Sequence, residues 1–219
     1  MARKAFVFLN GHFHKNDHKL IDRLLHEGKS IPLMIAVDGG LKFMQKFDFA
    51  LDYWITDLDS SPKVEKDFLR NTEILIHPSA KDQTDGELAL EFCLQRNVTD
   101  ITFFGWYDLR CETDHMLGNL MLFHRLTKRQ ANCRLRFMDS AQEICPLYNQ
   151  NLTLNGYKGR RLSIVPLDKT ITLTLKGTEY PAEELVVRRG QTIALRNRIS
   201  AKRASIRLKG AALAIIGDK

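Results

Sequence analysis

The sequence has little of what marks a secreted scaffold, a fibrous protein or a membrane protein. Its 219 residues include 4 cysteines, 6 prolines and 13 glycines, too few for a disulfide-rich or collagen-like chain. The longest stretch without a charged side chain, from Ile144 to Tyr157, contains polar residues and predicts no membrane span. No long apolar run precedes a small-residue cleavage site near the start, so a secretory signal is not expected. With 44% hydrophobic and 27% charged residues, the composition is typical of a soluble globular protein.

The cysteines are too scattered to form a recognisable metal site or disulfide framework. They stand at Cys93, Cys111, Cys133 and Cys145, without a close pair. This spacing favours reduced thiols over zinc ligands or disulfides. We therefore expect a cytoplasmic protein, since that compartment keeps thiols reduced.

Basic and acidic side chains are unevenly distributed along the chain. Residues 38–115 carry 8 basic and 16 acidic side chains, whereas residues 116–219 carry 19 and 7. A basic half suits a polyphosphate ligand as well as a nucleic acid. Only Tyr157 and Tyr180 supply aromatic rings after Tyr148, so a base-stacking platform is poorly supported. We expect neither a nucleic-acid nor a membrane partner.

The hydrophobic pattern predicts two parts with different architectures. In residues 1–142, short apolar runs alternate with helix-length amphipathic segments, which indicates a three-layer α/β domain with a mostly parallel sheet. From residue 143 to 219 the pattern changes to short alternating runs separated by turn residues, typical of an antiparallel β-sandwich. The runs expected as strands in the first part are 5–9, 33–37, 53–56, 74–76, 101–104 and 135–138. Helices are expected at 17–26, 41–47, 62–70, 85–95 and 114–126. In the second part, strands are expected at 152–154, 161–165, 171–175, 185–187, 192–196, 205–208 and 212–216.

Carboxylates follow the second and third predicted strands, at the end of an open parallel sheet where ligands bind. Asp38 is followed by Gly39 and Gly40, which permit a tight turn or the close approach of a ligand. Asp57 and Asp59 are one residue apart, which places both side chains on one side of an extended chain. Each motif taken alone is also typical of an ordinary turn or a helix cap.

Further acidic residues follow the next two strands. Thr84 and Glu87 form a capping-box pattern, which places Asp85 in the first turn of a helix. Six carboxylates are thereby expected on one rim: Asp38, Asp57, Asp59, Asp82, Asp85 and Asp114. Such a cluster needs compensation, which Mg²⁺ bridging to substrate phosphates supplies. The residues by themselves predict metal-dependent handling of a nucleotide polyphosphate.

The same residues resemble the motifs of the thiamin pyrophosphokinase family. In the first half the resemblance is carried by residues 38–40, 57–60, 81–90 and 114–120. In the second half it is carried by residues 163–167, 175–181 and 211–216. The resemblance implies an N-terminal catalytic domain, a C-terminal β-sandwich for thiamine binding and dimerisation, and a homodimer with active sites between subunits. It also implies a transferase reaction, in which a pyrophosphoryl group moves from ATP to the hydroxyl of thiamine, with Mg²⁺, to give AMP and thiamine diphosphate.

The resemblance also assigns roles to individual residues. Catalytic roles fall to Asp57, Asp59, Asp82 and Asp85, and metal binding to Asp57, Asp59 and Asp85. Nucleotide-binding roles fall to Asp38, Gly39, Gly40, Arg110, Asp114 and His115. Substrate binding falls to Gln83, Thr84 and Asn197. Of the two tryptophans, Trp54 is expected in the core, whereas Trp106 suits either the core or a ring-stacking surface.

Three features depart from the family pattern, and the altered loop among them motivates an alternative function. Thr56 replaces the usual glycine before the Asp-x-Asp motif, and Arg196 replaces a serine before Asn197. The loop over residues 105–115 lacks one glycine and is about two residues longer than the family's. One alternative is therefore a catalytically weakened relative that senses thiamine or thiamine diphosphate. A nucleic-acid-binding protein that uses the basic half is a third, weaker possibility.

Overall fold

The computed structural model describes residues 3–28, 30–57, 67–78, 83–107, 113–129 and 133–218, apart from the side chains of residues 122–129. The chain divides into two compact units. The first comprises Met1–Leu122 with Asn132–Ser140, and the second Phe123–Ala131 with Ala141–Lys219. No helix within the described ranges is both long and apolar enough to span a bilayer.

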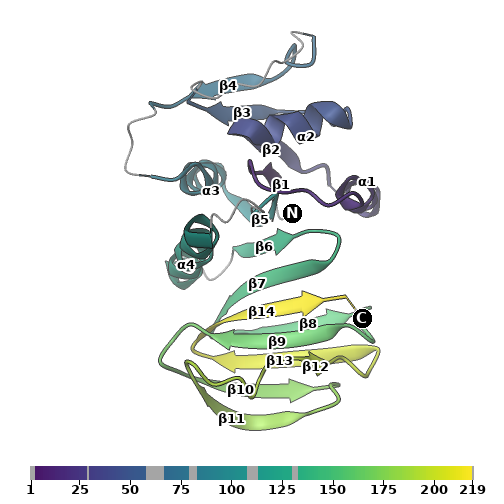
Figure 1. Cartoon of the computed structure of the whole chain (residues 1–219), viewed down its shortest axis with the longest axis vertical. Coiled ribbons are helices and arrows are strands. Elements are labelled where there is room, and N and C mark those ends of the chain that lie inside the picture. Colours follow the sequence, from purple (N-terminus) through teal and green to yellow (C-terminus); the bar gives the residue numbers. More distant parts are fainter. Residues whose placement is uncertain are drawn as a thin grey trace. The chain divides into compact units, whose positions relative to one another are not determined.

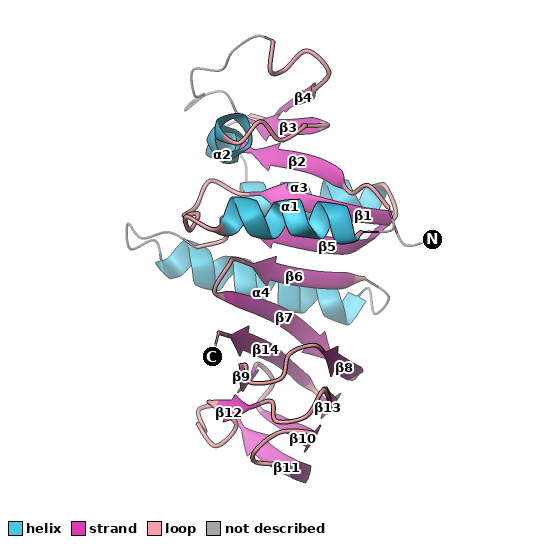
Figure 2. Ribbon diagram, turned by 90° about the vertical axis from the view of Figure 1, so that its right-hand side faces the viewer, coloured by secondary structure: helices cyan, strands magenta, loops and turns pink. Residues whose placement is uncertain are grey.

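The first unit is built on a parallel sheet with the strand order β6-β5-β1-β2-β3-β4. The strands are β1 (Arg3–Phe8), β2 (Leu33–Val37), β3 (Tyr53–Thr56), β4 (Glu73–Ile76), β5 (Val98–Phe104) and β6 (Arg134–Met138). The helical elements are α1 (Asp17–Glu27), the 3₁₀ turn η1 (Asp38–Gly40), α2 (Leu41–Lys46), α3 (Asp85–Gln95) and α4 (Thr113–Arg129). Figures 1 and 2 show α1 on one face of this sheet and α3 on the other.

Both faces of the sheet are apolar because helices cover both. Phe6 and Phe8 of β1 belong to the core cluster that contains Ile21 of α1 and Leu41 of α2. The intervening Val7 is also fully buried and, by the alternation of side chains along a strand, faces the opposite side. This continuous burial explains why the strands read as uninterrupted apolar runs in the sequence.

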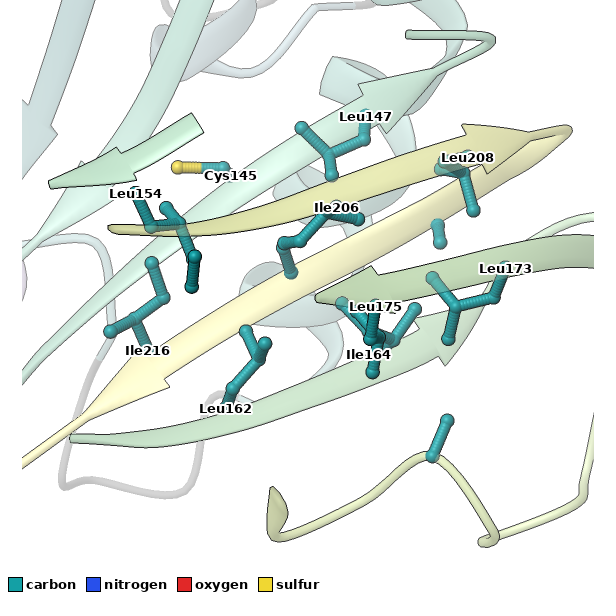
Figure 3. Close-up of a cluster of buried hydrophobic side chains, with 14 of the residues drawn as sticks. Cys145, Leu147, Leu154, Leu162, Ile164, Leu173, Leu175, Ile206, Leu208 and Ile216 are labelled. Atoms are coloured by element: carbon teal, nitrogen blue, oxygen red, sulfur yellow. The ribbon is translucent and has the colours of Figure 1, made fainter. Parts of the chain in front are cut away.

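The second unit consists of two antiparallel sheets, ordered β12-β9-β14-β7 and β11-β10-β13-β8. Its strands are β7 (Gln142–Tyr148), β8 (Asn151–Asn155), β9 (Arg161–Pro166), β10 (Thr170–Lys176), β11 (Ala182–Arg188), β12 (Asn197–Arg198), β13 (Arg203–Lys209) and β14 (Ala211–Gly217). Leucine and isoleucine side chains from both sheets meet in one core, including Leu162, Ile164, Leu173 and Ile206 (Figure 3). The expected fold class, α/β followed by a β-sandwich, is confirmed.

One predicted strand of the second unit was wrong, and one observed strand was not predicted. Residues 192–196 do not form a strand, because the Leu195 N–H bonds back to the Thr192 carbonyl in a turn and Arg196 has φ +58°, which a strand does not accommodate. Strand β7 was not predicted, and its Pro146, which lacks an N–H, is unusual in an interior strand. Pairing with β14, in which Pro146 lies opposite Leu213, holds it in the sheet nevertheless.

Part of one predicted helix is also absent. Residues 62–66 lie outside the described residues, and residues 67–70 form a turn in which the Arg70 N–H donates to the Asp67 carbonyl. The remaining predicted helices of the first unit are confirmed, with ends that differ by up to three residues.

The described cysteines are reduced, as the sequence predicted. Cys93, Cys133 and Cys145 are free thiols, and Cys111 lies outside the described residues. Burial raises the pKa of the Cys93 thiol to about 12 and that of Cys133 to about 11. Such thiols stay protonated and are poor nucleophiles at neutral pH.

Candidate active site

The loops that follow β1 and β5 meet at the point where the strand order reverses. The chain passes from β1 through β2 and β3 to β4 on one side, and β5 and β6 lie on the other side of β1. Backbone hydrogen bonds continue the contact past the strand ends, from Leu9 N–H to the Phe104 carbonyl (2.9 Å) and from Gly11 N–H to the Gly105 carbonyl (3.0 Å). In open α/β sheets the crevice at such a switch point is where nucleotides bind.

A cavity of about 330 Å³ opens at this switch point. Its walls come from the ends of β1, β2 and β5 and from the first turns of α3 and α4. The lining residues are Leu9, Asn10, Gly11, Val37, Asp38, Thr84, Asp85, Gly86, Gly105, Trp106, Tyr107, His115, Met116 and Asn119. Of the site residues predicted from sequence, the cavity brings together Asp38, Thr84, Asp85 and His115.

Two carboxyl groups from different elements touch in this cavity. Asp38, at the end of β2, forms a side-chain hydrogen bond with Asp85 at the start of α3, and a second with Thr56. Thr84 caps α3 by accepting a hydrogen bond from the Glu87 N–H (3.2 Å), so the predicted capping box begins the helix that carries Asp85. The backbone of Asp38 has φ +43°, and its carbonyl accepts a hydrogen bond from Trp54 Nε1 (3.2 Å).

Three of the six predicted carboxylates, those of Asp38, Asp57 and Asp85, lie close enough to interact. Burial, followed by the contact with Asp85, raises the pKa of Asp38 from 3.8 to about 6, and the Asp57 charge adds to the rise. A hydrogen bond from the Thr56 hydroxyl opposes it. Thr56 is a buried residue of β3 at the position where the family pattern has glycine. Its hydrogen bond favours the ionised form of the Asp38 carboxyl group. Asp59 and Asp82 lie outside the described residues.

The donor atoms in this cluster fit a hard divalent cation. Asp38 Oδ1 is buried and accepts no hydrogen bond from the described residues. Oxygen donors from one or two carboxylates, completed by substrate phosphates and water, are what Mg²⁺ takes in proteins. Within the described ranges no set of three or more His, Cys, Asp or Glu residues is arranged to hold a metal, so substrate phosphates and water would supply most of the ligands.

The pKa of Asp38 predicts how stability depends on pH. Between about pH 4 and 6 the folded protein binds a proton at Asp38 that the unfolded chain has released, so the free energy of unfolding falls as pH rises through this window. The Asp38→Asn variant lacks this loss. We expect its stability relative to the parent protein to increase from pH 4 to 6 and then level off. Urea denaturation with EDTA at several pH values measures this, and a pH-independent difference would contradict it.

Two predicted nucleotide-binding glycines have a steric role that the sequence did not indicate. A Cβ on Gly39 would lie 1.8 Å from Asn10 Oδ1, and one on Gly40 would lie 2.0 Å from the Phe8 carbonyl oxygen. These glycines therefore let the β2–α2 turn pack against the end of β1. Neither lines the cavity, and contact with nucleotide stays a prediction.

The first turns of α4 form one wall of the cavity, and only part of this wall was predicted from the sequence. His115 was predicted, whereas Met116 and Asn119 were not. Asn119 is four residues after His115, and this helical spacing was the signal that could have found it. Asp114 is exposed and is not among the lining residues, and Arg110 lies outside the described residues.

Two predicted substrate-binding side chains are occupied by other contacts. Gln83 Nε2 donates to Glu91 Oε1 (3.1 Å). In the second unit, the buried Asn197 accepts from the Tyr180 N–H (3.1 Å) and donates to the Tyr180 carbonyl (2.7 Å). Asn197 thereby fixes the loop at Tyr180, and its contact with substrate stays a prediction.

Two aromatic side chains that the sequence left unassigned complete the cavity. Trp106 is 6% exposed, and its ring packs against Tyr107 and Phe137 at centroid distances of 5.0 and 5.9 Å. The Tyr107 hydroxyl lies 2.7 Å from His14 Nε2. Burial and the charges of Asp139 and Asp17 raise the pKa of Tyr107 to about 12, so this hydroxyl remains a hydrogen-bond donor at neutral pH.

Comparisons with known proteins agree on one family. A family model described as thiamin pyrophosphokinase, catalytic domain, matches residues 24–135. A curated relative, the thiamine pyrophosphokinase of Bacillus subtilis, is 29% identical over 147 residues, which are 65% of this chain and 67% of that protein.

Solved structures share the fold over nearly the whole chain. The crystal structure of thiamine pyrophosphokinase from Bacillus subtilis has a TM-score of 0.81 at 23% identity and covers 99% of this chain and 100% of that one. Thiamin pyrophosphokinase from Candida albicans has a TM-score of 0.79 at 14% identity, covering 100% of this chain and 90% of that one.

Proposed function

The chain belongs to the thiamin pyrophosphokinase family, and we propose that it transfers the pyrophosphoryl group of ATP to the hydroxyl of thiamine. The products are AMP and thiamine diphosphate. The observation that carries the proposal is the contact between Asp38 and Asp85 inside a cavity at the switch point of the sheet. Clustered carboxylates suit a cation-bound polyphosphate better than they suit a free anion.

The reaction requires that the thiamine hydroxyl and the β-phosphorus of ATP are held in position and that the charge of the phosphates is neutralised. The thiamine hydroxyl oxygen forms a bond to the β-phosphorus of ATP, the bond from that phosphorus to the AMP oxygen breaks, and the hydroxyl proton is released. Holding the reacting groups in line contributes much of the rate in such transfers. Backbone bonds fix Leu9–Gly11 against Phe104–Gly105, which provides a rigid floor for the nucleotide.

We assign Mg²⁺ to the acidic cluster. Asp57 and Asp85, with Asp59 by the family resemblance, would hold it, and Asp38 adjoins them. When bound, Mg²⁺ neutralises phosphate charge that would otherwise be repelled by the carboxylates. We propose that Asp82 and Gln83 orient the reacting groups and that His115 and Arg110 contact the nucleotide.

We further propose that the protein is a cytoplasmic homodimer. Support for the dimer comes from apolar side chains exposed on the second unit: Tyr180, Val186, Ile193 and Leu195. Burial of such side chains between two copies is favourable. Support for the cytoplasm comes from the free thiols of Cys93, Cys133 and Cys145.

A product assay tests the function. Purified protein is incubated with ATP, thiamine and MgCl₂, and AMP and thiamine diphosphate are quantified by chromatography. We expect both products in equal amounts, and none when EDTA replaces MgCl₂. Binding of thiamine without formation of AMP would support the weakened relative instead. Salt-sensitive retention of RNA or DNA without either activity would support a nucleic-acid-binding protein.

A further inference from the structure

Trp106 carries a buried hydrogen-bond donor at the wall of the cavity. Its indole Nε1 is buried and has no hydrogen-bond partner within the described part of the chain. A buried N–H without an acceptor is unfavourable, so such groups usually have a partner in the functional state. Trp106 also lines the cavity at the switch point. A ligand in this cavity is therefore adjacent to an unsatisfied donor.

The surroundings of Trp106 hold its backbone and its ring in place. Gly105, which precedes it, has φ +62°, and a Cβ there would lie 2.6 Å from the Phe13 ring and 2.7 Å from the Leu9 carbonyl oxygen. The Tyr107 carbonyl, which follows, accepts a hydrogen bond from the His12 N–H (2.6 Å). Ring contacts with Tyr107 and Phe137 confine the indole. The indole of Trp106 is thus preorganised, so a hydrogen-bond acceptor on a ligand can reach it without a rearrangement of the ring.

The other tryptophan shows how this protein satisfies an indole when no ligand is required. Trp54, also buried, donates its Nε1 hydrogen bond to the Asp38 carbonyl at 3.2 Å. Trp106 lines the cavity, whereas Trp54 contacts a lining residue through its bond to Asp38, and only Trp54 has its acceptor within the described residues. Within the described part of the chain, this difference makes Trp106 the indole that is available to a ligand.

We propose that the Trp106 Nε1–H donates a hydrogen bond to the ATP bound in this cavity, which makes Trp106 a nucleotide-binding residue. The inference rests on the proposed function, since it takes the cavity to be the ATP site. The nucleotide is the favoured ligand because the cavity lies at the strand-order reversal. A phosphate oxygen or an adenine ring nitrogen is the acceptor, and the experiment distinguishes the two.

Proton–nitrogen NMR of the indole groups tests the proposal on the unmodified protein. The two tryptophans give two Nε1–H signals, which Trp54→Phe and Trp106→Phe variants assign. On saturation with a non-hydrolysable ATP analogue, we expect the Trp106 proton signal to move downfield and its exchange with water to slow, by more than for Trp54. If adenosine alone reproduces the shift, the acceptor is the base; if only tripolyphosphate does, the acceptor is a phosphate oxygen.

Binding to the Trp106→Phe variant supplies the second measurement. Phenylalanine keeps an aromatic ring beside Tyr107 and Phe137 but lacks the N–H. We expect its Kd for the ATP analogue to rise about 3- to 10-fold, the usual effect of losing one hydrogen bond, with the Kd for thiamine unchanged. An unmoved Trp106 signal while the analogue binds the parent protein would overturn the proposal and leave the function standing. Failure of the analogue to bind the parent protein at all would overturn the proposed function.

Discussion

The Asp85→Asn variant is expected to lose about 10²- to 10³-fold in kcat, the usual loss when one preorganised charge-stabilising group is removed. Asp85 lines the cavity and touches Asp38, and we propose that it holds Mg²⁺. Asparagine has nearly the same size, so the packing at the start of α3 is retained. Removal of one of two adjacent acidic groups also lowers their repulsion. Steady-state kinetics and thermal denaturation should therefore show lost turnover with Tm unchanged or raised.

The matched control for this variant is Glu87→Gln. Glu87 lies in the same first turn of α3 but is not among the residues that line the cavity. Both substitutions remove one negative charge near the N-terminus of the same helix, so their effects on the helix dipole are comparable. We expect Glu87→Gln to keep turnover close to that of the parent protein. Similar losses in both variants, or near-parent activity of Asp85→Asn, would refute the assignment of Asp85.

The Gly40→Ala variant is expected to lose on the order of 3 kcal/mol of folding free energy, at the upper end of what overpacking costs. Gly40 has φ −57° and ψ −24°, which alanine adopts readily, so backbone conformation does not explain this glycine. The added methyl would lie 2.0 Å from the Phe8 carbonyl oxygen and 3.0 Å from that of Leu9. Those are backbone atoms of β1 and its following loop, which cannot move aside as a flexible side chain does.

The Gly118→Ala variant is the control for this prediction and is expected to change stability in the opposite direction. Gly118 is an exposed residue of α4, and a methyl there meets no heavy atom of the described residues within 4 Å. Alanine in a helix interior is favoured over glycine by about 1 kcal/mol, so we expect this variant to be slightly more stable than the parent. Urea denaturation measures both changes. A Gly40→Ala variant as stable as Gly118→Ala would show that β1 and the β2–α2 turn separate without cost.

Loss of activity is expected to accompany the loss of stability in Gly40→Ala. Asp38 lies two residues earlier in the same turn, so a shift of that turn moves its carboxyl group relative to Asp85. From the sequence, the glycines after Asp38 were expected to permit a tight turn or the close approach of a ligand. At Gly40 the structure adds the approach of Phe8, which is 32 positions away and is brought there by pairing of β1 with β2.

Local structure was largely readable from the sequence because its causes are local. The apolar runs that became β2 and β3, and the helix from Asp85 to Gln95, were predicted with the bounds observed. Thr84 and Glu87 identified the start of that helix because the capping hydrogen bond spans three residues. The strand predicted at residues 192–196 was wrong because a turn forms there, and the strand that contains Pro146 was missed because pairing with the distant β14 decided its conformation.

The sequence by itself identified the acidic residues. It also predicted that they lie at one edge of the sheet, because ligands bind at the carboxyl ends of parallel strands. Only the tertiary structure decided which of them touch. Asp38 and Asp85 share a hydrogen bond across 47 residues, Asn197 turned out to be occupied by Tyr180, and Trp106 proved to be a buried donor without a partner in the described residues. Hydrogen bonding and desolvation depend on neighbours that the order of residues along the chain does not specify, and folding alone supplies those neighbours.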